Sequence, residues 1–199
     1  EGGMIATNNK KLHDKIWSLK EIGKNKIKYH KVDNSSNNFP YLHDSIGTNA
    51  RITEIQSCIG NYQLNKLKNY IRRRNLNAMI YYEKLKKCKY LIIPKFSSNI
   101  THSYYRYTVI INDKLIKRSL LMKNLKKKGV ECNVGGCPTI YDEKYFKNNF
   151  RINKNNFPNT EYLKDKTISF IVDQTVDKKE IRKVCDILLF QINKLVMKK

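Results

Sequence analysis

The segment Gly47–Arg51 combines side chains and backbone groups that suit an anion. It carries the side-chain amide of Asn49 and the guanidinium of Arg51, and it lies just before a predicted helix. Backbone N–H groups and the helix dipole favour phosphate at the N-terminus of a helix. A plain loop followed by a helix cap would account for the same residues. Residue types and spacing leave both interpretations open.

Other reactive residue types occur without the partners that their chemistry needs. The adjacent carboxylates Asp142 and Glu143 are most simply solvated rather than a general acid/base pair. Cys137 follows two glycines and has no histidine near it in the sequence, so a thiol in a turn is favoured over a nucleophile. The five cysteines and four histidines show no metal-ligand spacing. Composition and spacing therefore predict no catalytic group and no metal site.

The composition is that of a folded protein with an unusual excess of lysine. The 199 residues are 40% hydrophobic and carry a formal net charge of +23. The basic clusters Arg72–Arg74 and Lys126–Lys128 lie in helical patterns without interleaved aromatics, so we expect solvated helix faces and no nucleic acid partner. No apolar run approaches the roughly 20 residues of a membrane span, and we expect no membrane association. The cysteines are scattered and odd in number, and no segment resembles a secretory signal. These features indicate a cytoplasmic protein.

Periodicity places the candidate site between helices in an α/β chain. We expect a short strand over residues 3–7, then a helix capped by Asn9 and closed by Gly23 as its C′ residue. Residues 24–48 read as a long loop. The pattern Thr53–Gln56 is a capping box, and it opens a helix that runs to about Lys87.

The rest of the chain alternates strands and helices. Strands are predicted over 103–111, 130–134 and 168–172 from their β-branched and aromatic residues. Asp113 is predicted to cap one helix, which ends at Gly129, and Asp177 is predicted to cap the last helix. The fold class is therefore α/β.

Several short motifs follow one another in a fixed order along the chain. They are Glu1–Thr7, Gly47–Gly60, Gln63–Leu67, Arg73–Ala78, Tyr104–Tyr107, Gly135–Phe146 and Asp177–Ile181. In order and spacing they resemble the DegT/DnrJ/EryC1/StrS family of sugar aminotransferases. One departure is Asp173–Gln174, where members of the family tend to carry His-Pro.

The resemblance implies the C-terminal part of a pyridoxal-phosphate-dependent transferase of the aspartate aminotransferase fold (fold type I). We expect the end of the large cofactor-binding domain over residues 1–50, a long interdomain helix over 51–88, and a small C-terminal α/β domain over 89–199. The implied substrate is a keto nucleotide sugar of polysaccharide, lipopolysaccharide or glycan biosynthesis, with glutamate as amino donor. The implied assembly is a homodimer.

The resemblance also assigns site residues. It implies that Asn49 reaches the cofactor phosphate of the neighbouring subunit and that Arg51 also lies in the cofactor site. It places Tyr104 and Tyr105 near the substrate mouth. The Schiff-base lysine of the family lies a few residues before the Glu1–Gly3 block, so we expect no catalytic lysine in this chain. A fragment of an aminotransferase and a non-catalytic remnant or interaction module both remain open.

Overall fold

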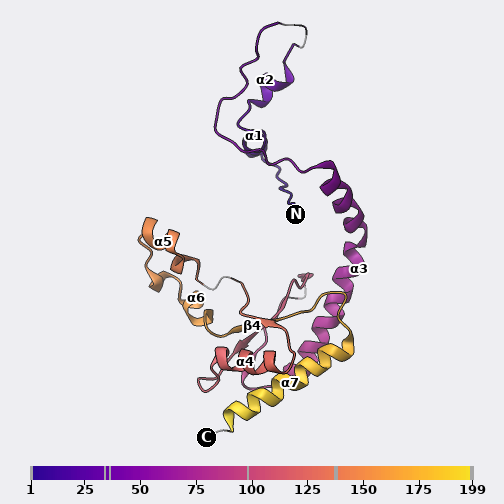
Figure 1. The fold of residues 1–199 in the computed structure, drawn as a ribbon, viewed down its shortest axis with the longest axis vertical. Helices are drawn as coiled ribbons and strands as arrows, with labels where there is room; N and C mark the ends of the chain where they lie inside the picture. The colour runs from indigo at the N-terminus through magenta and orange to yellow at the C-terminus, as the bar shows by residue number, and fades with distance from the viewer. Residues whose placement is uncertain (1, 34, 36, 98, 137–138, 198–199) are drawn as a thin grey trace. The chain divides into compact units, whose positions relative to one another are not determined.

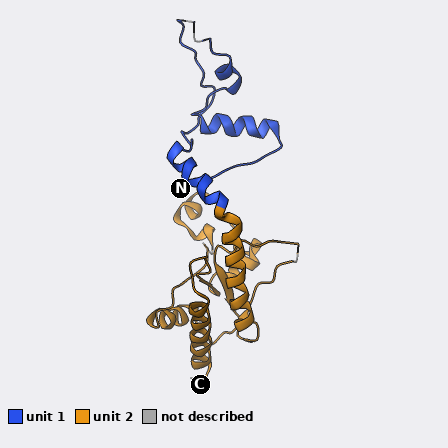
Figure 2. Ribbon diagram, turned by 90° about the vertical axis from the view of Figure 1, so that its right-hand side faces the viewer, with its two compact units in different colours: residues 1–65 blue, residues 66–199 orange. Residues whose placement is uncertain are grey.

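A computed structural model describes residues 2–33, 35, 37–97, 99–136 and 139–197. The chain divides into two compact units, unit 1 over residues 1–65 and unit 2 over residues 66–199 (Figure 1, Figure 2). Helix α3, Glu54–Leu85, contributes its first turns to unit 1 and its remainder to unit 2. The boundaries expected from the sequence, at residues 50 and 88, stay a prediction.

Unit 1 consists of short helices and irregular chain. It contains α1 (Lys10–Lys20), α2 (Lys26–His30) and the start of α3. Asn9 caps α1 as predicted, since its side chain accepts from the backbone N–H of Leu12 at 3.1 Å. Helix α2 lies within the segment expected to be loop, and its first turn is capped in the same way by Asn25.

The strand expected over residues 3–7 is absent. A strand needs a paired neighbour for its backbone groups, and no described residue pairs with this segment. Its apolar side chains are accordingly exposed, with Met4 at 96%.

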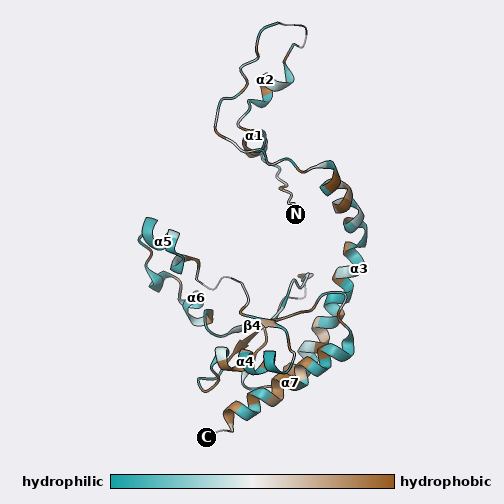
Figure 3. Cartoon of the chain, in the orientation of Figure 1, coloured by the Kyte–Doolittle hydropathy of each residue, from teal (hydrophilic) through white to brown (hydrophobic). Residues whose placement is uncertain are grey.

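The capping box that opens α3 forms as predicted. The Thr53 N–H donates to Gln56 Oε1 at 3.0 Å, and the Gln56 N–H donates to Thr53 Oγ1 at 3.3 Å. The helix ends at Leu85, close to the expected Lys87. Its first turns carry a cluster of hydrophobic residues (Figure 3), among which Ile55 is 75% exposed.

Unit 2 is built around a four-stranded antiparallel sheet in the order β1-β2-β4-β3. The strands are β1 (Leu91–Ile92), β2 (Tyr107–Ile111), β3 (Cys132–Asn133) and β4 (Thr167–Phe170). The sequence predicted β2, β3 and β4 but not β1. In the central pair, Val109 lies opposite Ile168.

The helices of unit 2 are α4 (Arg118–Lys127), α5 (Lys144–Asn149), α6 (Pro158–Leu163) and α7 (Lys178–Val196), with short 3₁₀ turns η1 (Ile140–Asp142) and η2 (Lys154–Asn156). Asp177 caps α7 by accepting from the Lys179 N–H at 3.0 Å. Gly129, with φ +76°, closes α4 as expected. Asp113 does not cap α4. Its side chain accepts a hydrogen bond from the Leu115 N–H, and the helix begins only at Arg118.

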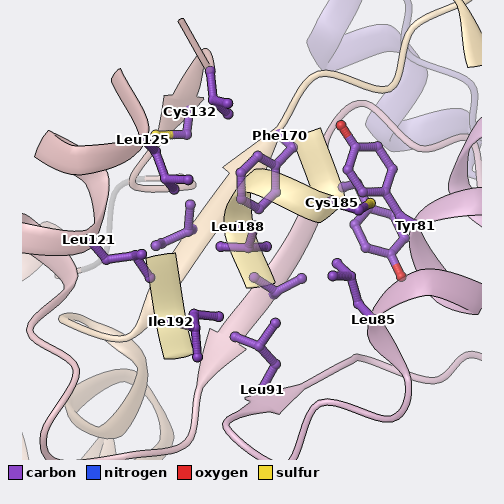
Figure 4. Packing of buried hydrophobic residues seen from close by; sticks show 14 of the residues in the cluster. Tyr81, Leu85, Leu91, Leu121, Leu125, Cys132, Phe170, Cys185, Leu188 and Ile192 are labelled. Atoms are coloured by element: carbon purple, nitrogen blue, oxygen red, sulfur yellow. The ribbon is translucent and has the colours of Figure 1, made fainter. Parts of the chain in front are cut away.

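One face of the sheet is buried against helices. Along β2 the residues Tyr107, Val109 and Ile111 are buried and their neighbours are partly exposed. Facing them are side chains of α3, α4 and α7, which Figure 4 shows converging. The labelled members of this core are Tyr81, Leu85, Leu91, Leu121, Leu125, Cys132, Phe170, Cys185, Leu188 and Ile192. Unit 2 is thus a two-layer α/β body with its own hydrophobic core.

Candidate phosphate and substrate sites

The C-terminus of α1 ends in two consecutive left-handed residues. Ile22 has φ +64° and Gly23 has φ +83°. The Gly23 N–H donates to the Ser18 carbonyl at 2.7 Å, which closes the last turn. The C′ position is therefore occupied by Ile22, and Gly23, which was predicted to be the C′ residue, lies one position beyond it. A β-branched residue at positive φ is strained, and such strain needs support from its surroundings.

The segment 47–50 supplies that support. Thr48 N–H donates to the Leu19 carbonyl at 2.7 Å, and Ala50 N–H donates to the Lys20 carbonyl at 3.1 Å. In return, the Ile22 N–H donates to the Thr48 carbonyl at 3.2 Å. The carbonyls that α1 leaves unpaired at its end are thus satisfied by the segment that carries the predicted phosphate ligands.

Gly47 allows this close approach. A Cβ placed on Gly47 would lie 2.3 Å from the Gly23 nitrogen and 2.6 Å from the Leu19 carbonyl oxygen. Both are backbone atoms, so no side-chain rotation can relieve the clash. The predicted anion segment is held in place by backbone contacts that require glycine here.

Glu21 is the one charged residue of unit 1 that is buried within the described chain, at 7% exposure. Its carboxylate is paired with Lys20 and lies 3.5 Å from Arg51 Nε. The hydrogen bond from Lys20, with the charge of Arg51, holds the pKa of the Glu21 carboxyl below its usual range. Sequence reasoning missed this residue.

The Arg51 guanidinium also orients Asn49. Arg51 Nε donates to Asn49 Oδ1 at 3.2 Å. Because a guanidinium only donates, the amide oxygen of Asn49 must face Arg51 and the NH₂ group must face away. Asn49 is exposed, so this NH₂ group is presented to solvent. An outward amide donor with a guanidinium beside it fits a phosphate oxygen.

A hollow of about 770 Å³ adjoins Arg51 within unit 1. It is lined by apolar side chains including Trp17 and Ile52, together with Lys20 and Arg51. The Trp17 indole packs against Tyr29 and His30, with ring centroids 5.5 and 5.9 Å apart.

The two predicted substrate-contact tyrosines have different surroundings. Tyr104 is partly buried in a run of aromatic rings, with its ring centroid 4.2 Å from that of His102. Burial raises the pKa of the Tyr104 hydroxyl. Tyr104 has φ +44°, and its N–H donates to His102 Nδ1 at 3.0 Å. Tyr105 is 81% exposed and lines a small pocket with Arg74 and Arg106. The exposed side chain of Tyr105 can contact a substrate without rearrangement.

The remaining candidate groups lie elsewhere in unit 2. Asp142 accepts from Lys154 Nζ at 2.8 Å, and this bond lowers the pKa of the Asp142 carboxyl well below its usual range. An ionised, paired carboxylate suits the solvated interpretation better than a proton donor. Cys137 and Pro138 lie outside the described residues. The described residues contain no cluster of metal-ligating side chains and no helix long and apolar enough to cross a membrane.

The family model described as the DegT/DnrJ/EryC1/StrS aminotransferase family matches residues 1–189. The chain belongs to this family. Over 151 residues it is 30% identical to the GDP-perosamine synthase of Escherichia coli O157:H7, covering 74% of this chain and 38% of the synthase.

Two solved structures of the family's fold are similar to this chain. The X-ray structure of an aminotransferase from Psychrobacter cryohalolentis matches with a TM-score of 0.82 and 26% identity, over 96% of this chain and 51% of that one. A GDP-4-keto-6-deoxymannose-3-dehydratase with a trapped PLP-glutamate geminal diamine matches with a TM-score of 0.79 and 23% identity, over 92% and 49%.

These matches agree with a mixed α/β portion of a fold type I transferase. Pyridoxal phosphate (PLP) is the family's cofactor. The chain spans about half or less of the length of each of these proteins.

Proposed function

We propose that this chain provides the C-terminal part of a PLP-dependent aminotransferase that acts on a keto nucleotide sugar. The observation that carries the proposal is the outward amide donor of Asn49, held by Arg51, in a member of this family. When bound, PLP supplies an electron sink for the chemistry at the amino group. The described residues bind and orient the cofactor, and none of their lysines is assigned as the reacting lysine.

In this proposal Asn49 donates a hydrogen bond to a phosphate oxygen of the cofactor held by the neighbouring subunit of a homodimer. Arg51 adds positive charge beside that phosphate and fixes the amide orientation. The exposure of Asn49 supports a ligand from outside its own unit. Glutamate as amino donor and a cytoplasmic location belong to the same proposal, and the four described cysteines, all unpaired, agree with a reducing compartment.

The first experiment tests the phosphate contact. In the full-length protein, Asn49→Ala is expected to weaken PLP binding about tenfold, because a hydrogen bond to a charged group contributes about 1.5–3 kcal/mol. Equilibrium titration of the apoprotein measures this change. Asn193→Ala, an exposed asparagine on α7, is the matched control and should leave the affinity unchanged. Equal PLP affinity in Asn49→Ala and the parent protein would remove the phosphate role.

The second experiment tests the reaction. The full-length protein is incubated with isotope-labelled glutamate and a set of keto nucleotide sugars, and the sugar products are analysed by mass spectrometry. Labelled nitrogen in the sugar is the expected result. Loss of a sugar oxygen without gain of nitrogen would instead indicate a dehydratase. No change in any sugar would favour the non-catalytic remnant.

A further inference from the structure

The turn that leads into β2 contains a hydrogen bond that depends on the state of a histidine. The Tyr104 N–H donates to His102 Nδ1 at 3.0 Å. A ring nitrogen that accepts a hydrogen bond carries no proton, so the imidazole is neutral and its proton lies on Nε2. The turn is therefore built around one protonation state of His102.

The residue that donates this bond has a strained backbone. Tyr104 adopts the left-handed conformation, with φ +44°. This conformation is unfavourable for a bulky side chain, and it persists only where the surroundings support it. The hydrogen bond to His102 Nδ1 supplies such support at the strained residue itself.

Both ends of the turn are anchored to the rest of unit 2. Before it, Asn75 Nδ2 of α3 donates to the His102 carbonyl at 2.8 Å. After it, β2 begins at Tyr107, which is paired with Phe170 of β4. A change in the His102 side chain is therefore expressed in residues 103–106, between two fixed points.

Aromatic packing leaves the His102 ring no second way to accept the bond. Its centroid lies 4.2 Å from that of Phe96 and 4.2 Å from that of Tyr104, so the ring is packed against two others. A half-turn of the imidazole would bring the carbon Cδ2, which has no lone pair, to the place of Nδ1. The acceptor is thus Nδ1 alone.

Protonation of the imidazole removes that acceptor. An imidazolium has two N–H donors and no acceptor, so a proton on Nδ1 would face the donating N–H of Tyr104. The left-handed backbone then loses its support while its strain remains. Because histidine gains its proton between pH 5 and 8, this loss is expected on mild acidification.

The titratable groups that pack around this turn keep their charge over the same range. The Tyr104 hydroxyl stays neutral, because burial raises its pKa. Arg74 and Arg106, which line the small pocket at this turn, stay protonated. The Asp173 carboxylate of that pocket stays ionised, because a hydrogen bond from the Thr175 hydroxyl holds the pKa of Asp173 below its usual range.

We propose that His102 is a proton-sensitive switch of the turn 103–106. The neutral imidazole holds Tyr104 in its left-handed conformation, and a proton on Nδ1 releases it. Tyr105, the next residue and 81% exposed, moves with the turn. The switch stands on residues of unit 2 alone, and only an effect of this movement on a bound substrate rests on the proposed function.

Nitrogen NMR of the full-length protein, isotope-labelled at histidine, tests the protonation state. His102→Phe assigns the signals, because the His102 resonances disappear from its spectrum. At pH 8 we expect a proton on Nε2 of His102 and none on Nδ1. A proton on Nδ1 at this pH would overturn the switch.

Hydrogen exchange of the Tyr104 amide, corrected for the intrinsic rate at each pH, tests the release. From pH 8 to pH 5 its protection is expected to fall about fivefold, the effect of losing one hydrogen bond. His102→Asn offers a side-chain oxygen at the same reach, which accepts without gaining a proton, so protection should stay high throughout. His102→Phe keeps a ring but lacks the acceptor, and it should show low protection at every pH.

His43→Asn is the matched control, because it makes the same substitution at an exposed histidine of unit 1. It should show the pH dependence of the parent protein. An equal loss on acidification in the parent and in His102→Asn would overturn the proposal, and so would full protection in His102→Phe. Neither measurement uses PLP or a sugar, so the result is independent of the proposed function.

Discussion

Unit 2 contains the whole buried core of the described chain, whereas unit 1 contains the candidate cofactor-phosphate site. The core residues run from Ala78 to Ile192, and neither α1 nor α2 has a buried residue. Unit 1 is instead held by backbone hydrogen bonds around the end of α1 and by ion pairs of Glu21. The difference teaches that a ligand-binding segment can be ordered locally without a hydrophobic core beneath it, at the cost of low local stability.

The largest expected effect breaks unit 2 alone. Leu188→Ala removes a fully buried side chain of α7 and is expected to lower the free energy of unfolding by about 3 kcal/mol. Leu19→Ala, at a leucine of α1 that is 45% exposed, should cost less than about 1 kcal/mol. Urea-dependent hydrogen exchange measures the first loss at the β2 and β4 amides and the second at the amides of α1. Similar losses in the two variants would contradict a core confined to unit 2.

The second effect breaks unit 1 alone. Gly47→Ala forces a methyl group onto the backbone of Gly23 and Leu19, and overpacking of this kind costs about 1–3 kcal/mol. We expect faster hydrogen exchange at Thr48 and Ala50 and unchanged exchange in β2 and β4. Gly60→Ala, where a Cβ meets nothing within 4 Å, is the control. Protection retained at Thr48 would show that the segment is not held as described.

A third change sharpens the role of Glu21 in unit 1. Glu21→Gln keeps the shape but removes the charge that faces Arg51, so PLP binding to the full-length protein is expected to weaken about threefold; the effect stays below about 1 kcal/mol because the Arg51 partner is half-exposed. Added to Asn49→Ala, the substitution should weaken binding no further. Additive losses would mean that Glu21 does not act through Asn49.

The same carboxylate gives unit 1 a pH dependence. The folded pKa of Glu21 lies below its ordinary value of 4.5, so its contribution to stability is present above pH 4.5 and is lost as the pH falls through the lowered folded pKa. Protection of the Ala50 amide should decline over this acidic range in the parent chain. Glu21→Gln should lack that decline, and an identical decline in both would assign it to another group.

The smallest expected change in stability concerns the exposed apolar start of α3. The 199-residue chain should self-associate in size-exclusion chromatography, because contiguous exposed apolar surface promotes association. Ile55→Lys should reduce this association while changing the free energy of unfolding by less than about 0.5 kcal/mol. Gln63→Lys adds the same charge to an exposed position of the helix and should have little effect. A monomeric parent chain would contradict the prediction.

Local sequence signals predicted the parts of the fold that depend on local contacts. The capping box at Thr53, the Asn9 and Asp177 caps and the glycine after α4 all act within a few residues, and all form. Strand β1 was missed because it is two residues long and exists through pairing with Ile110 and Ile111, far along the chain. The strand expected at 3–7 failed for the same reason, since pairing is not encoded locally.

The candidate sites divide in a similar way. Asn49 and Arg51 form a candidate site in the sequence because they stand in one short motif before a helix, and their role towards the cofactor stays a prediction. Glu21 follows a lysine in an ordinary helix end, and its role becomes visible only when Arg51 is brought beside it. Arg74 and Arg106 are 32 positions apart in the sequence, and Arg74 belongs to a cluster that reads as a solvated helix face. No sequence pattern links these two arginines, which line the same small pocket only in the folded unit 2.

The packing of Trp17 against Tyr29 and His30 makes the chain's single tryptophan an optical probe of unit 1. Because unit 2 contains no indole, selective excitation of Trp17 follows the melting of unit 1, while the thirteen tyrosines, most of them in unit 2, supply the contrasting signal. One unlabelled sample therefore carries two fluorophores that distinguish the region without a core from the region with one.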